Sequence, residues 1–140
     1  MNLDYISGFF DADGSISIGY DSKKSKYRSR IKIDFTNTKL SILLEIQKFF
    51  LNNYNIKLFL STKPARKENH LTSYTLSTSS SQKSLEICKL LNSYHPIKLH
   101  RINTVLKYHN KVTKRNGKYT EKDIIKKLAY ERLFFCSIFQ

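Results

Sequence analysis

The spacing of the apolar residues changes from a helical period to a strand period, and this change occurs twice along the chain. Between residues 3 and 13, and again between residues 39 and 52, they recur every three to four positions, as on one face of an amphipathic helix. Two stretches follow each of these segments in which apolar and polar residues alternate, as in strands that are buried on one face. The four stretches are 15–20, 27–36, 56–63 and 71–78. A third helical segment covers residues 81–94, so the predicted fold class is α+β, with the order αββαββα and an internal αββ repeat.

The length of the chain limits the number of domains. With 140 residues, of which 40% are hydrophobic, it can bury a core but cannot form two domains of ordinary size, so a single domain over residues 1–140 is predicted. Two further helices are predicted near the C-terminus. One covers residues 102–112, and the other begins at a capping box formed by Thr120 and Asp123 and runs to Ile138.

The charge of the chain indicates a polyanionic partner. Lys and Arg total 25 against 11 acidic residues, which gives a formal net charge of +14 and a pI near 9.8. Nucleic acid is favoured over an anionic membrane surface, because no stretch has the length of a spanning helix and no signal peptide opens the chain. We therefore predict a soluble intracellular protein that binds nucleic acid and no membrane.

Two other features of the composition concern location. Cys88 and Cys136 lie far apart in apolar helical contexts, which predicts buried free thiols in a reducing compartment rather than a disulfide or a metal site. The chain is rich in Lys, Asn and Ile, which is typical of an A·T-rich genome and favours an organelle such as a mitochondrion or a chloroplast.

The segment Ile6–Gly14 ends the first predicted helix with two carboxylates and a glycine. Ser7, Gly8 and Ala12 form a side with little side-chain bulk, so another backbone can approach the helix there. Gly14 fits the position just past a helix end, where a positive φ suits a residue without Cβ. The first strand is predicted to begin directly after it.

Asp11 and Asp13 stand at the C-terminus of this helix, where the helix dipole disfavours a carboxylate by up to about 1 kcal/mol. A positive group should therefore compensate them: a neighbouring basic side chain, backbone donors of a partner helix, or a divalent cation such as magnesium, which prefers oxygen ligands. Taken alone, an Asp-x-Asp-Gly sequence more often forms a turn with its own side-chain hydrogen bonds. A calcium-binding loop fits less well, since the sequence lacks the further ligands of that motif.

The nine residues of Ile6–Gly14 resemble the signature of the LAGLIDADG homing endonucleases, from which they differ at Ser7, Phe9 and Phe10. The resemblance implies the fold of that family, in which two αββ units form a curved four-stranded antiparallel sheet that lies in the DNA major groove, here followed by C-terminal helices. It also implies that the motif helix packs against its twin. Because the chain has one motif, a homodimer with a long, pseudo-palindromic DNA target is predicted. The predicted dimer-interface residues are Ser7, Gly8, Asp11 and Ala12.

The same resemblance implies that Asp13, the last acid of the motif, lies at the active centre. Two Asp13 carboxylates that met across the dimer would repel each other unless a divalent metal bound between them. Asp13 is therefore the predicted metal ligand, with Mg²⁺ as the cofactor and Ca²⁺ or Mn²⁺ as substitutes. The resemblance also implies that Asn37, at the end of the second predicted strand, lies near the scissile phosphate.

A basic residue that supports the active centre is also implied, in a turn that follows Pro96. Counting from the proline selects Arg101, an alignment that favours a lysine selects Lys98, and His100 lies between them. Pro96 is expected to interrupt the helical pattern. An arginine can stabilise negative charge on a phosphate but cannot act as a base. The predicted catalytic residues are Asp13, Asn37, Lys98 and Arg101.

The polar faces of the predicted strands carry cations and hydroxyl groups. A solvated sheet surface is their ordinary explanation. The resemblance implies instead that they read bases, since Arg and Lys pair with guanine, Asp accepts from cytosine, and Ser and Thr contact any base. The residues predicted to bind DNA are Ser17, Arg28, Arg30, Lys32, Asp34, Lys57, Ser61, Lys63, Ser73 and Thr75. The loop cations predicted to contact phosphates are Lys23, Lys24, Lys26, Arg66 and Lys67.

Three functions fit these features. The first is an intron-encoded, site-specific homing endonuclease that hydrolyses phosphodiester bonds in both strands of DNA with a divalent metal. An intron RNA maturase of the same fold and a non-cleaving nucleic-acid-binding regulator are the alternatives. The intact acidic motif favours the nuclease. The substitution Asp13→Asn separates them, because it should abolish cleavage while sparing duplex binding, whereas an RNA-folding role should tolerate it.

Overall fold

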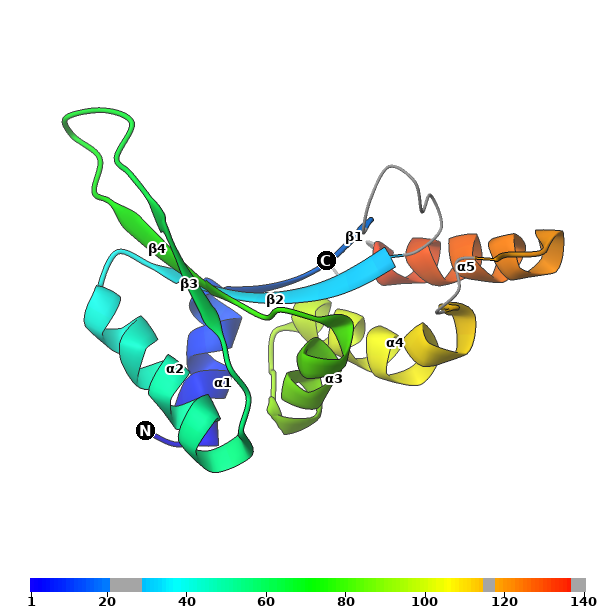
Figure 1. The fold of residues 1–140 in the computed structure, drawn as a ribbon, viewed down its shortest axis with the longest axis horizontal. Helices are drawn as coiled ribbons and strands as arrows, with labels where there is room; N and C mark the ends of the chain where they lie inside the picture. Colours follow the sequence, from blue (N-terminus) through cyan, green and yellow to red (C-terminus); the bar gives the residue numbers. More distant parts are fainter. Residues whose placement is uncertain (21–28, 115–117, 137–140) are drawn as a thin grey trace.

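The computed structural model describes residues 1–20, 29–114 and 118–136 (Figure 1). Its helices are α1 (Leu3–Asp13), α2 (Leu40–Tyr54), α3 (Ser81–Leu90), α4 (Pro96–Val112) and α5 (Glu121–Phe134). Its strands are β1 (Gly14–Tyr20), β2 (Ser29–Asn37), β3 (Phe59–Lys63) and β4 (Ser73–Ser77). The α+β class and the αββαββα order are confirmed, and α4 and α5 follow as C-terminal helices.

The four strands form one antiparallel sheet in the order β1-β2-β4-β3. Each αββ unit contributes a hairpin, and the second strands of the two hairpins, β2 and β4, pair at the centre of the sheet. The helices α1 to α4 lie on one face of the sheet, and the sheet curves so that the opposite, concave face stays open (Figure 1). The sheet therefore has one face that packs on the core and one face that is open.

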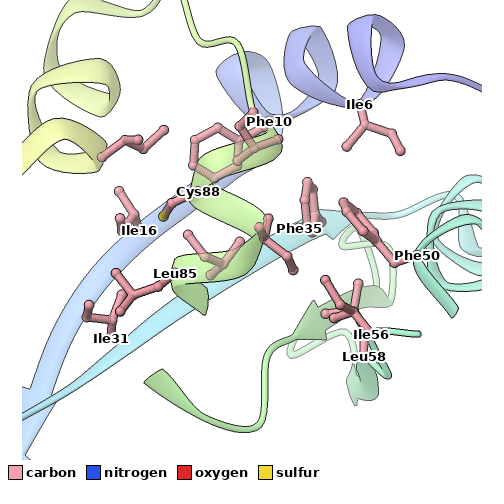
Figure 2. Close-up of a cluster of buried hydrophobic side chains, with 14 of the residues drawn as sticks. Ile6, Phe10, Ile16, Ile31, Phe35, Phe50, Ile56, Leu58, Leu85 and Cys88 are labelled. Atoms are coloured by element: carbon pink, nitrogen blue, oxygen red, sulfur yellow. The ribbon is translucent and has the colours of Figure 1, made fainter. Parts of the chain in front are cut away.

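The core is built around the ring of Phe35 in β2. The centroid of this ring lies 5.9 Å from that of Phe10 in α1 and 6.3 Å from that of Phe50 in α2, so one strand residue joins the first helices of both αββ units (Figure 2). Ile31 and Ile33 are buried on the same face of β2. Full burial of each of these large side chains contributes about 1.5–3 kcal/mol relative to exposure. The predicted alternation of β2 is thereby confirmed.

Gly14 joins α1 directly to β1, and close packing explains why a glycine stands there. Its φ of −97° is extended, so the predicted positive φ is wrong. A Cβ atom on Gly14 would lie 2.2 Å from Cδ2 of Phe10 and 2.7 Å from the carbonyl oxygen of Phe10. Any side chain at this position would therefore displace the buried Phe10 ring or the last turn of the helix.

The connection between α3 and α4 differs from the prediction. α3 ends earlier than expected, and Pro96 begins α4 instead of interrupting a helical pattern. Proline is compatible with the first helical position, because the N–H that it lacks would have no helical partner there. The His95 imidazole caps the helix by accepting a hydrogen bond from the backbone N–H of Lys98, at 3.3 Å. The three candidate basic residues therefore lie on the first turns of a helix, and not in a turn.

β3 starts at a later residue than predicted, whereas α5 starts at the predicted capping box. β3 begins later than predicted, because Ile56 and Leu58 are buried before the strand ladder starts, and the Ile56 N–H bonds back to the carbonyl of Phe50 at 3.1 Å. The capping box of Thr120 and Asp123 is confirmed at the start of α5. That helix ends at Phe134, and Ile138 lies outside the described residues.

Both cysteines carry free thiols. Cys88 is buried in the core (Figure 2), where burial raises the pKa of its thiol to about 12, whereas Cys136 is half-buried. Within the described part of the chain, none of the helices has the length and apolar character needed to cross a membrane.

Candidate active site and nucleic-acid interface

Asp13 is the last residue of α1, and its carboxylate is exposed beside the end of β2. The Asn37 side-chain amide donates a hydrogen bond to Asp13 Oδ2 at 3.0 Å, while its own oxygen accepts from the Lys39 backbone N–H at 2.8 Å. The pairing of Gly14 with Phe35 in the β1–β2 hairpin brings these two residues together. Two predicted site residues are thus adjacent, and the hydrogen bond that the Asn37 oxygen accepts from Lys39 fixes which side of the amide faces Asp13.

Asp11 has a different environment from Asp13, although it is only two residues away. Its Oδ1 accepts a hydrogen bond from Ser93 Oγ, and its Oδ2 accepts one from the Tyr94 backbone N–H at 2.7 Å. Both donors belong to the connection between α3 and α4 of the same chain. These hydrogen bonds are not among the three kinds of compensation predicted for the acids: their donors belong to the same chain, a source that the sequence pattern did not suggest.

Lys98 lies on the first turn of α4 and reaches the end of the motif helix. Its Nζ donates hydrogen bonds to the carbonyl oxygens of Phe10, at 2.9 Å, and of Asp11, at 2.8 Å. A cation is favourable at a helix C-terminus, where carbonyl groups have no helical partner. Burial lowers the pKa of Lys98, and the nearby carboxylates of Asp11 and Asp13 oppose that shift. The structure therefore brings Asp13, Asn37 and Lys98 together.

The two competing basic residues contact α5. The Arg101 guanidinium lies over the rings of Phe134 and Phe135, at 5.1 and 5.7 Å from their centroids. Its Nε is buried and makes no hydrogen bond within the described part of the chain. His100 Nε2 lies 2.7 Å from the carbonyl oxygen of Leu133. Both side chains thus hold the end of α5.

The four predicted dimer-interface residues divide between two faces of α1. Gly8 and Ala12 are exposed, together with Tyr5, and a Cβ atom on Gly8 would meet no atom within 4 Å. Ser7, by contrast, is only 3% exposed, and its Oγ accepts a hydrogen bond from the Asn92 backbone N–H at 2.9 Å. Ser7 belongs to the inside of its own chain, which corrects its assignment to the interface. Its neighbour at helical spacing, Asp11, faces the same connection.

The residues predicted to bind DNA can be placed by the strand register. The open face carries Ser17 paired with Lys32, Gly19 paired with Arg30, Ser61 paired with Thr75, and Lys63 paired with Ser73. Asp34 lies in the same face between Ser15 and Ser77. Lys57 is exposed but precedes β3, and Arg28, Lys23, Lys24 and Lys26 lie outside the described residues. The described strand residues of the predicted set therefore share one surface.

Side-chain contacts organise this surface. Ser77 Oγ donates to Asp34 Oδ1 at 2.5 Å, and Lys32 Nζ lies 3.8 Å from the same oxygen. The hydroxyl groups of Thr36 and Thr75 are 3.1 Å apart. The predicted set omitted Ser77, Thr36 and Phe59, which the register places on the same face. Alternation within β2 and β4 was the signal that could have found the first two.

The loop between β3 and β4 continues the basic surface. A hollow of about 220 Å³ at the base of this loop is lined by Lys63, Arg66 and His70, and Lys67 is exposed beside it. Cations in such a position suit a polyanionic partner on the open face.

Comparison with known proteins gives the same picture. A family model described as LAGLIDADG endonuclease matches residues 6–110. The chain is similar to the crystal structure of the LAGLIDADG homing endonuclease I-GzeII in complex with its DNA target, with 18% identity and a TM-score of 0.65 over 96% of this chain and 44% of that one. It is also similar to the archaeal intron-encoded homing endonuclease I-Vdi141I complexed with DNA, with 15% identity and a TM-score of 0.52 over 94% of this chain and 82% of that one.

The chain thus spans less than half the length of the first of these proteins. At 18% and 15% identity, the two structures establish the fold alone. The assignment to a family rests on the family model, which matches residues 6–110. No curated protein matches the chain.

Proposed function

The chain belongs to the LAGLIDADG endonuclease family, and from this premise we propose that it is an intron-encoded homing endonuclease that cuts both strands of a long, pseudo-palindromic DNA site. The observation that supports the proposal is that Asn37 bonds to Asp13, and Lys98 to two carbonyl groups of the last turn of the motif helix, where β1 of the sheet begins. A DNA duplex on the open face of that sheet would lie next to the exposed Asp13 carboxylate.

The donor set at Asp13 suits a divalent metal shared between two chains. The carboxylate is exposed, and the one side-chain hydrogen bond that it accepts from the described residues leaves oxygen lone pairs for a cation such as Mg²⁺, or Ca²⁺ or Mn²⁺ in its place. No cluster of three or more His, Cys, Asp or Glu side chains occurs among the described residues. Further ligands would therefore come from the partner's Asp13, a DNA phosphate and water. A bound Mg²⁺ would polarise the scissile phosphodiester and favour ionisation of water.

The remaining steps fall to the side chains of this chain. Asn37 holds one oxygen of Asp13 by its amide N–H and so fixes the orientation of the carboxylate. The Lys98 ammonium has three donors, of which two bind α1 carbonyls. The third can bind a phosphate oxygen and stabilise the negative charge that develops there during hydrolysis.

The chain has one motif, so the proposal requires a homodimer in which two motif helices meet. The exposed face of Tyr5, Gly8 and Ala12 supports this arrangement, because it allows a second helix to approach closely and would place the two Asp13 residues near the symmetry axis.

The test is an in vitro selection of cleaved duplexes from a randomised DNA library in Mg²⁺, with Asp13→Asn in parallel. The proposal predicts one pseudo-palindromic site, cut on both strands by the unmodified protein and bound but not cut by the variant. If both proteins bind structured intron RNA and neither cuts DNA, the maturase is the correct function. Specific DNA binding without metal-dependent cutting by either protein would instead indicate a non-cleaving regulator.

A further inference from the structure

Phe59 is a large aromatic side chain on the polar face of the sheet. It is the first residue of β3, and its side chain is 49% exposed. The register pairs it with Ser77, which belongs to the open face, whereas the next residue, Leu60, pairs with the buried Leu76 on the helix side. Phe59 therefore points away from the core.

The neighbours of Phe59 on that face are small or polar. Across the sheet, the row that contains it runs through Ser77 and Asp34 to Ser15. Among the strand residues of the open face that the structure describes, Phe59 is the one aromatic side chain. An exposed phenylalanine needs no special explanation on an ordinary surface. Here it stands within the surface proposed to enter the major groove.

The surroundings of the ring suit an apolar contact with a base edge. The Lys57 ammonium lies 5.6 Å from the ring centroid, and Ser77, the strand partner of Phe59, holds the Asp34 carboxylate by a 2.5 Å hydrogen bond. In the major groove, thymine is the base that presents a methyl group, and apolar side chains such as Phe contact it. The ring offers no hydrogen-bonding group to the acceptors and donors of the other bases.

We propose that Phe59 is a specificity-determining residue that contacts the 5-methyl group of one thymine in each half-site of the DNA target. This inference rests on the proposed function, since it requires that the open face lie in the major groove. Phe59 would recognise an apolar group of a base, whereas the other residues predicted to contact bases act through charge and hydrogen bonds.

The size of the effect follows from the burial of one methyl group. Removing it should weaken binding about fourfold per half-site, and about fifteenfold when both half-sites of a dimer are changed, because independent contacts add in free energy. A contact through the Lys57 ammonium to phosphate would be insensitive to the methyl group, which separates the two kinds of contact.

The experiment uses the DNA site recovered by selection with the full-length protein. Each thymine is replaced in turn by deoxyuridine, which keeps the base pairing and removes the 5-methyl group, and dissociation constants are measured at one salt concentration. For the unmodified protein, one thymine per half-site should show the fourfold loss. For Phe59→Ser, which places a residue typical of this face at the strand edge, the same replacement should have no effect.

Two further variants complete the test. Thr62→Ala changes the same strand on the opposite face, outside the residues predicted to bind DNA, so it should keep the full methyl effect as a matched control. Phe59→Leu keeps an apolar side chain and should retain part of the effect. Thermal melting of each variant establishes that it is folded before binding is compared.

Two results would overturn the inference in different ways. If a site is recovered and no thymine shows a methyl effect that Phe59→Ser removes, the assignment of Phe59 is wrong while the endonuclease proposal stands. If selection recovers no DNA site, the endonuclease proposal fails and the assignment of Phe59 fails with it.

Discussion

Lys98 and Arg101 are three positions apart at the start of α4, yet their charges have different surroundings. The Lys98 ammonium binds two carbonyl groups at the end of the motif helix, and the Arg101 guanidinium lies over two phenylalanine rings at the end of α5. Only the first of these contacts places a cation beside Asp13. We therefore expect Lys98 to support the active centre and Arg101 to stabilise the helical layer.

This assignment predicts different consequences for two matched substitutions. Lys98→Met should lower the cleavage rate about a hundredfold, the typical cost of losing one donor that stabilises developing negative charge. Arg101→Met should lower the melting temperature and leave the single-turnover cleavage rate nearly unchanged. Both rates are measured at saturating protein, so that a change in binding does not enter. The reverse pattern would assign the role to Arg101, the position obtained by counting from Pro96.

For individual residues, the sequence predicted the acids and their nearest partners but not the faces on which they lie. The motif and its resemblance to a family pointed to Asp13, Asn37 and Lys98, which the structure brings together. Ser7 and Gly8 are adjacent in sequence and both small, yet they differ by about 100° around the helix axis. Which of them is buried depends on Asn92 in the α3–α4 connection, which lies 85 positions from Ser7, so no local sequence pattern indicates that contact.

At the scale of elements, the contact between α4 and α5 contains buried titratable groups. Lys127 of α5 is fully buried, and its Nζ donates to Thr113 Oγ1 at 2.6 Å and lies 5.4 Å from the Tyr130 ring centroid. Burial lowers the pKa of Lys127 from 10.5 to about 8, against the attraction of Glu131. His109 of α4 bonds to the Tyr130 hydroxyl at 2.9 Å, and burial and the Lys127 charge lower the pKa of His109 from 6.5 to about 4. The ammonium therefore destabilises the folded state near neutral pH.

The substitution Lys127→Met should raise the free energy of unfolding at pH 7 by about 1–3 kcal/mol, because an apolar side chain of similar volume replaces a buried charge. The sign of the pH dependence follows from the lowered pKa. Between pH 8 and 10.5 the unfolded chain holds the Lys127 proton and the folded chain releases it. As pH rises, the free energy of unfolding of the unmodified protein therefore increases relative to that of the variant.

The difference between the two proteins is the quantity to measure, since the raised pKa of the Cys88 thiol lowers the stability of both above pH 9. Chemical denaturation at several pH values gives this difference directly. A difference that stays constant from pH 7 to 10.5 would show that the buried Lys127 is not the source. Thr113→Val, which removes the hydrogen-bond partner of the ammonium, should destabilise the protein at pH 7 and serves as the opposite control.

The helices and strands themselves were largely predictable. Each of them in the αββ units is buried on one face, so its apolar residues recur in the sequence with the period of a helix or of a strand. β2 alternates as predicted, and the capping box of Thr120 and Asp123 marks the start of α5. The start of α4 was not predictable in the same way. A proline can end one helix or begin the next, and the choice here depends on a cap by His95 and on the anchoring of the preceding connection to Asp11.

At the scale of the whole molecule, two surfaces meet at Asp13. Asp13 ends α1 and directly precedes β1, an edge strand of the sheet whose concave face is open (Figure 1), and the exposed residues Tyr5, Gly8 and Ala12 precede it on α1. A partner chain on the second surface would extend the first into a longer groove, with two Asp13 carboxylates near its centre. The formal net charge of +14 per chain suits such a groove to a duplex and makes binding depend strongly on salt.

Gly8→Ala tests whether that helix face joins two chains. A Cβ atom at Gly8 meets no atom within 4 Å in the monomer, and alanine is the better helix former, so the substitution should stabilise an isolated chain by about 0.5–1 kcal/mol. In a dimer with closely packed helices, the same methyl group would overfill the contact at a typical cost of about 1–3 kcal/mol, so the dimer should dissociate at least about fivefold more readily.

Sedimentation equilibrium and thermal melting together measure the two opposite effects. Gly19→Ala is the matched control, because a Cβ atom at Gly19 also meets no atom within 4 Å but lies on the sheet, so it should leave the dimer unchanged. If Gly8→Ala stabilises the chain and dimerisation is unaffected, the two Asp13 residues are not brought together through this face. Cleavage of a palindromic site by such a dimer would then require another arrangement of the two chains, because the carboxylates could not share a metal.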